Sequence, residues 1–144
     1  MDAPRAYATA GPFRKALEER LKRISQAEQV DINRLRRQVS FDRLLARLFR
    51  VEPTPWALKG GYALELRFKT ARSTIDIDLS LQPVTAATDQ TEASRMIREM
   101  LQQAAGISLK DWFEYRIGSP VMDLEAAPYG GARYPVEASV VSPK

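Results

Sequence analysis

Two aspartates separated by a single residue are the clearest candidates for chemistry in this chain of 144 residues. Asp76 and Asp78 lie in the segment 74–79, where apolar and polar residues alternate with the period of two that is typical of a half-buried strand. Residues two apart on a strand point to the same face, and two neighbouring carboxylates repel each other unless a cation lies between them. The spacing therefore predicts a Mg²⁺ or Mn²⁺ platform suited to phosphoryl chemistry.

A pair of glycines precedes these aspartates. Gly60 and Gly61 follow Lys59, between a predicted strand at 56–59 and a predicted helix at 62–68. Because glycine has no Cβ, the backbone N–H groups at such a helix start can approach an anion closely. We therefore predict that Lys59, Gly60 and Gly61 bind phosphate groups, with Arg72 adding positive charge and Thr74 adding a hydroxyl donor.

Each of these features is common by itself. A lone Gly-Gly is usually a turn, and a lone Asp-x-Asp is usually a solvated strand edge. A glycine pair followed, one helix and one loop later, by two aspartates alternating with apolar residues is much rarer. The combination favours a metal-dependent nucleotide site.

The composition excludes several other kinds of site. The chain has no cysteine and no histidine, which removes thiolate chemistry, histidine general bases and the usual zinc sites. Any metal must be held by oxygen ligands. We expect no membrane span and no secretory signal, and hence a cytoplasmic protein.

The elements predicted to position this site give a mixed α/β (α+β) fold, with N-terminal helices followed by a small mixed sheet and flanking helices. Gly11-Pro12 is typical of a helix start, and Asp31 is a candidate cap for a second helix. We expect an N-terminal helical segment at 1–52 packed on a core at 53–144 that carries the candidate site, together forming one structural domain. The later elements are expected to be a helix at 90–105 and strands at 112–117, 121–126 and 134–141.

Positive charge is concentrated in the N-terminal third. Residues 1–50 contain 12 Lys/Arg against 6 Asp/Glu, whereas the remainder contains 10 against 12. This asymmetry is compatible with docking of a polyanion such as RNA, and equally with solvated helix faces. A non-catalytic module that binds RNA or a protein is therefore an alternative function.

Two segments carry a resemblance to a known family. Segments 58–64 (LKGGYAL) and 72–79 (RSTIDIDL) resemble the first motif of the DNA polymerase β-type nucleotidyltransferases, and more closely the abortive-infection type IV toxins of the AbiEii/AbiGii group. Segment 128–136 (PYGGARYPV) is similar to that group as well. The resemblance spans about residues 56–140.

The resemblance implies transfer of a nucleotide from an NTP with Mg²⁺ to an acceptor, which in such toxins can be the end of a tRNA, and neutralisation by a separate antitoxin protein. It implies that Gly60 and Gly61 hold the triphosphate, that Asp76 and Asp78 ligate the metals, and that Arg72 steadies the loop or the phosphates. A protein acceptor is a further possibility. An Asp-x-Asp glycosyltransferase is the other enzyme class to weigh, although the larger nucleotide-binding sheet it needs has no counterpart before the motif.

One departure from the family pattern concerns a third carboxylate on a later strand. Asp123 and Glu125 precede the segment after which it is expected, and only Glu137 follows it. We therefore expect the chain to be cut short at its C-terminus, with the third carboxylate absent or beyond Lys144, and with weakened or lost catalysis.

Overall fold

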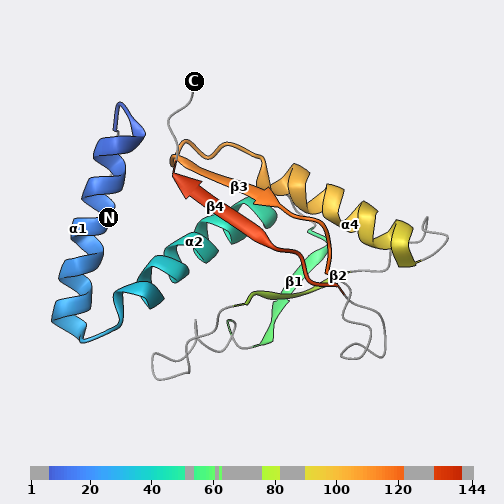
Figure 1. The fold of residues 1–144 in the computed structure, drawn as a ribbon, viewed down its shortest axis with the longest axis horizontal. Coiled ribbons are helices and arrows are strands. Elements are labelled where there is room, and N and C mark those ends of the chain that lie inside the picture. The colour runs from blue at the N-terminus through green and yellow to red at the C-terminus, as the bar shows by residue number, and fades with distance from the viewer. Residues whose placement is uncertain are drawn as a thin grey trace.

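The computed structural model describes residues 7–50, 54–60, 62, 76–81, 90–121 and 132–140. Within these residues it contains three helices and four strands, and Figure 1 shows α1 at one side and α4 at the other, with α2 and the β3–β4 ribbon between them. The α+β class is confirmed. The elements in chain order are α1 (Ala10–Glu28), α2 (Ile32–Leu48), β1 (Trp56–Lys59), β2 (Asp78–Leu81), α4 (Gln90–Ala105), β3 (Phe113–Ile117) and β4 (Val136–Val140).

The first two helices form a hairpin whose turn was predicted from the sequence. Asp31 is the N-cap of α2, and its side chain accepts a hydrogen bond from the backbone N–H of Asn33 at 3.0 Å. Gln29 ends α1 in the left-handed conformation, with φ of 53°. Across the hairpin, Arg36 pairs with Glu18 at 2.7 Å. The predicted helix start at Gly11 is confirmed, because α1 begins at Ala10.

The first sheet pairs β1 with β2 in antiparallel register, from Trp56 opposite Leu81 to Lys59 opposite Asp78. The predicted strand at 56–59 is confirmed. The strand predicted at 74–79 is shifted, since β2 begins at Asp78 and extends to Leu81, with Asp76 just before it. The physical reason is the short partner, because β1 ends where Gly60 turns the backbone to φ of 77°. Residues 74 and 75 lie outside the described ranges.

The second sheet pairs β3 with β4, also antiparallel, from Phe113 opposite Val140 to Ile117 opposite Val136. Both strands are shorter than predicted. Trp112 has φ of 68°, which takes it out of the strand conformation, and Pro135 has no N–H to continue the ladder. The strand predicted at 121–126 is described only at Val121, which forms an isolated bridge with Arg133.

The hydrophobic core joins α2, α4, β1 and β3. Its buried residues from the two helices are Leu44, Leu45, Leu48, Leu101 and Ala105, and those from strands and the turn after β1 are Trp56, Tyr62, Tyr115 and Ile117. The predicted helix at 90–105 is confirmed, and its Ile97 and Met100 pack against this core. Of the helix predicted at 62–68, only Tyr62 is described, and it is helical. No helix in the described part of the chain is long and apolar enough to cross a membrane.

A buried arginine fixes α2 to the segment before β3. The Arg47 side chain is 1% exposed, and its Nη atoms donate to both carboxylate oxygens of Asp111 at 2.6 and 2.9 Å. Its remaining N–H groups donate to the backbone carbonyls of Ile107, Arg43 and Phe113 at 2.9–3.0 Å. All five guanidinium donors are therefore satisfied, which is what allows this charge to lie in the core.

The pKa values of two residues in and beside this network, Asp111 and Tyr115, are shifted. Burial alone would raise the pKa of Asp111, but hydrogen bonds from Arg47, from Arg43 and from the backbone N–H of Phe113 lower it below its usual value. Burial raises the pKa of Tyr115 to about 12, despite its hydroxyl donating to the Ser40 carbonyl at 2.7 Å. Both groups are held in the protonation state that they have at neutral pH.

Candidate functional site

The end of the β1–β2 ladder brings together three of the residues singled out from the sequence. Lys59 is directly opposite Asp78, and Gly60 follows Lys59 at the point where β1 ends. Directly opposed residues on paired strands project to the same face of the sheet. Lys59 and Asp78 are both exposed, so a cationic and an anionic side chain share one solvent-facing surface.

Gly60 is in van der Waals range of the Asp78 side chain. A Cβ built on Gly60 would lie 3.0 Å from Asp78 Cβ and 3.0 Å from Cγ, and would overlap its Oδ2 atom. The φ of 77° is also one that residues with a side chain rarely adopt. Glycine is thus favoured here for two reasons, and the close anionic neighbour is the chain's own Asp78 carboxylate.

The two aspartates are both exposed to solvent, Asp78 on β2 and Asp76 just before this strand. Asp76 and Asp78 are exposed, while Ile77 and Leu79 are half-buried and pack against the core. The predicted alternation of exposed and half-buried residues is present over 76–79, while a common strand face for the two aspartates stays a prediction, because only Asp78 lies on β2. Two exposed carboxylates fit Mg²⁺ or Mn²⁺, because Mg²⁺ in nucleotide sites is held by one or two carboxylates and completed by water and substrate phosphates.

No third acidic ligand joins them within the described residues, where no group of three or more His, Cys, Asp or Glu side chains is close enough to hold a metal ion. Glu137 lies on β4, opposite Arg116, in the second sheet. Asp123 and Glu125 are outside the described ranges, as are three of the predicted phosphate-binding residues, Gly61, Arg72 and Thr74.

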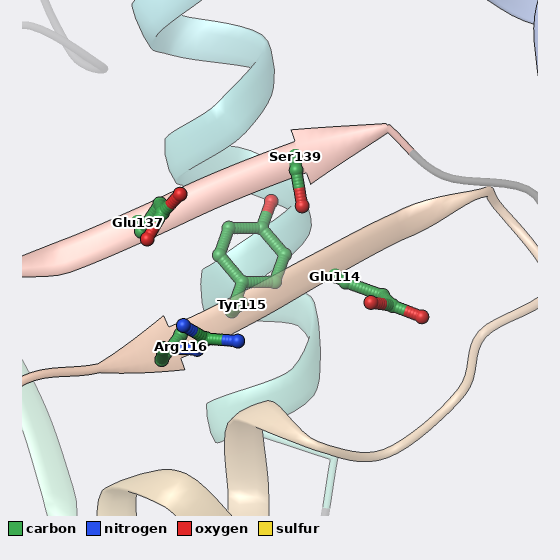
Figure 2. A pocket seen from close by; sticks show the side chains of 5 residues that line it. All are labelled: Glu114, Tyr115, Arg116, Glu137 and Ser139. Carbon is green, nitrogen blue, oxygen red and sulfur yellow. The ribbon is translucent and has the colours of Figure 1, made fainter.

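Glu137 contributes instead to a hollow on the β3–β4 ribbon, shown in Figure 2. The hollow has a volume of ≈ 120 Å³ and is lined by Glu114, Tyr115, Arg116, Glu137 and Ser139. Sites for nucleotide-sized ligands measure about 300–1,000 Å³. The hollow is therefore too small for an NTP. The candidate site remains the end of the β1–β2 ladder that carries Lys59, Gly60 and Asp78, which we call the β1–β2 corner.

One contact at this corner was not predicted from the sequence. Tyr62, just after the glycine pair, is fully buried, and its hydroxyl donates to Asp42 Oδ1 at 2.6 Å. A buried tyrosine usually needs a polar partner for its hydroxyl, so a partner could have been anticipated. Its identity could not, because Asp42 is 20 residues away on another helix.

Comparison with known proteins bears on what this corner does. No curated protein matches the chain. A family model described as "Nucleotidyl transferase AbiEii toxin, Type IV TA system" matches residues 43–143. The match begins within α2 and includes both two-stranded sheets, the glycine pair and both aspartates. The chain therefore belongs to the AbiEii family of nucleotidyl transferase toxins of type IV toxin–antitoxin systems.

Proposed function

We propose that this chain is a metal-dependent nucleotidyltransferase that transfers NMP from an NTP to an RNA or protein acceptor. The observation that carries the proposal is the contact between Gly60 and Asp78, within the region that matches the toxin family. It places a glycine turn, an exposed lysine and a pair of exposed carboxylates at one end of a sheet. The family match favours nucleotidyl transfer over glycosyl transfer as the chemistry of this arrangement.

In this proposal Asp76 and Asp78 hold Mg²⁺ or Mn²⁺, which when bound supplies positive charge to the phosphate oxygens. Lys59 shares the face of Asp78 and offers a second positive charge to those oxygens. Gly60 and Gly61 would present backbone N–H groups to the triphosphate, with Arg72 and Thr74 as the further phosphate-binding residues that we propose.

The reaction would form a bond between an acceptor hydroxyl oxygen and the α-phosphorus. The bond from that phosphorus to the oxygen bridging the α- and β-phosphates would break, and pyrophosphate would leave. The hydroxyl proton would pass to solvent.

The proposal is tested with NTPs labelled at the α-phosphate, incubated with the chain, Mg²⁺ and either total RNA or total protein. We expect label to enter one acceptor class, and to be lost in Asp78→Asn and on chelation of the metal. Gly11→Ala is the matched control, because a Cβ at Gly11 meets nothing within 4 Å. Binding of RNA without any transfer of label would instead support the non-catalytic module suggested by the basic first 50 residues.

We further propose that a cognate antitoxin protein neutralises the chain in the cytoplasm, where NTPs and tRNA are available. Co-expression with a candidate antitoxin protein, followed by the same labelling assay, tests the neutralisation. Transfer of label or growth inhibition that is unchanged by every candidate antitoxin would contradict it.

A further inference from the structure

Tyr62 lies in a socket formed by one turn of α2. Its side chain has no exposed surface. Its hydroxyl donates to Asp42 Oδ1 at 2.6 Å and lies 3.4 Å from the Gln38 carbonyl oxygen. The Phe41 ring meets the Tyr62 ring edge to face, with centroids 4.9 Å apart and planes at 87°. Positions 38, 41 and 42 share one helix face, so a single turn of α2 contacts both the ring and the hydroxyl.

The hydrogen bond to Asp42 is the strongest polar contact in this socket. An O–H group donating to a carboxylate at about 2.5–2.7 Å is roughly twice as strong as a bond between neutral groups. Asp42 is itself exposed, so shortening its side chain would remove the hydrogen bond without opening a cavity in the core. The contact can therefore be tested apart from the packing of the tyrosine ring.

Tyr62 is separated from Gly60 by only two peptide units. Each peptide unit has a fixed span of about 3.8 Å between Cα atoms, so the Cα atoms of Gly60 and Tyr62 can be at most about 7.6 Å apart, and a large displacement of Tyr62 would move Gly60. Gly60 in turn has atoms of the Asp78 side chain where its own Cβ would be. The socket on α2 and the carboxylate on β2 thus constrain the same turn from two sides.

We propose that Asp42 is a positioning residue, which holds the Tyr62 hydroxyl and thereby keeps Gly60 against the carboxylate of Asp78. The consequence for nucleotide binding rests on the proposed function. The positioning itself is a property of the free chain, and it can be measured without any nucleotide.

The first experiment follows the backbone amide resonances of Gly60 and Asp78 by NMR in the folded, nucleotide-free chain. We expect Asp42→Ala and Tyr62→Phe to shift both resonances in the same direction, and the double variant to add little, because both changes remove one hydrogen bond. Asp42→Asn retains an acceptor oxygen and should return the resonances toward their original positions. Tyr115→Phe is the matched control, since its hydroxyl also donates to α2, at Ser40, away from the glycine turn.

The second experiment measures the affinity for each NTP with Mg²⁺ in the same variants. We expect Asp42→Ala to weaken binding about tenfold, which corresponds to about 1.4 kcal/mol, with rescue by Asp42→Asn and no effect of Tyr115→Phe. Unmoved Gly60 and Asp78 resonances in a folded Asp42→Ala chain would overturn the inference. Failure of the unsubstituted chain to bind any NTP would overturn the proposed function instead, while the resonances still decide whether Asp42 positions the turn.

Discussion

Replacing Gly60 with alanine perturbs the candidate site at its most constrained point. The backbone of Gly60 has φ of 77°, and the left-handed conformation costs a residue with a Cβ about 1–2 kcal/mol. The new Cβ would also overlap Asp78 Oδ2 and lie 3.0 Å from Asp78 Cβ and Cγ. Rotation of the exposed Asp78 side chain can move Oδ2 and Cγ away, at a further cost of about 0.5–1.5 kcal/mol if it leaves its preferred rotamer, whereas the close contact with Asp78 Cβ needs a small backbone shift.

We therefore expect Gly60→Ala to lower the free energy of unfolding by about 2–3 kcal/mol, and the melting temperature by about 4–10 °C. The affinity for Mg²⁺ and NTP should fall at least about tenfold, because the rotation moves a proposed metal ligand. Urea unfolding followed by circular dichroism measures the first effect, and calorimetric titration measures the second. Gly11→Ala should instead stabilise α1 by about 0.5–1 kcal/mol and leave binding unchanged. A Gly60→Ala chain with unaltered stability and unaltered NTP affinity would refute the reasoning.

Three further predictions concern the network that fixes α2. Arg47→Ala should lower the free energy of unfolding by about 3–5 kcal/mol in urea unfolding, because it leaves Asp111 without its main partner. Arg36→Ala, at an exposed ion pair, should have much the smaller effect in the same experiment. Since the pKa of Asp111 is lowered by folding, its contribution to stability is present above its usual value of 3.8 and is lost as the pH falls through its lower folded pKa. Asp111→Asn should therefore make the free energy of unfolding fall less steeply as the pH is lowered below about 4. A fall as steep as that of the unsubstituted chain would contradict this. The pKa of Tyr115 is raised to about 12, so its contribution is complete below pH 10 and is lost as the pH rises through 12. An absorbance titration should show late phenol ionisation that Tyr115→Phe reduces, in addition to any from Tyr134, whose pKa burial also raises, and ionisation of all tyrosines near pH 10 would count against it.

Local signals in the sequence were sufficient for much of the architecture. Asp31 as a helix cap, the short strand at 56–59 and the helix at 90–105 depend on residues close in sequence, and the structure confirms each. The alternation around Asp76 and Asp78 predicted correctly that both are exposed and that Ile77 and Leu79 are half-buried, because such a pattern depends on neighbouring side chains. The start of β2 was misplaced, since a strand boundary is set by the partner strand, and β1 ends at Lys59, opposite Asp78.

The contacts that the sequence did not predict join residues far apart in the chain. Arg47 and Asp111 are separated by 64 positions, and Asp42 and Tyr62 by 20. Neither arginine nor aspartate is expected in a core, and only the tertiary arrangement shows that each charge meets the other with all its hydrogen bonds satisfied. Helix caps and strand faces could be predicted because they depend on residues close in sequence. The partner of a buried polar group could not, because it depends on which distant segments the fold brings together.

The proposed nucleotidyltransferase function depends most directly on metal-dependent binding of an NTP at Asp76 and Asp78. Calorimetric titration of the chain with each NTP, with and without Mg²⁺, tests it, with Asp76→Ala and Asp78→Ala as the site variants. We expect that one NTP binds only in the presence of Mg²⁺, and that either substitution abolishes this binding while the circular dichroism spectrum is unchanged. Equal NTP affinity in the unsubstituted chain and in both variants, or binding that ignores Mg²⁺, would contradict it.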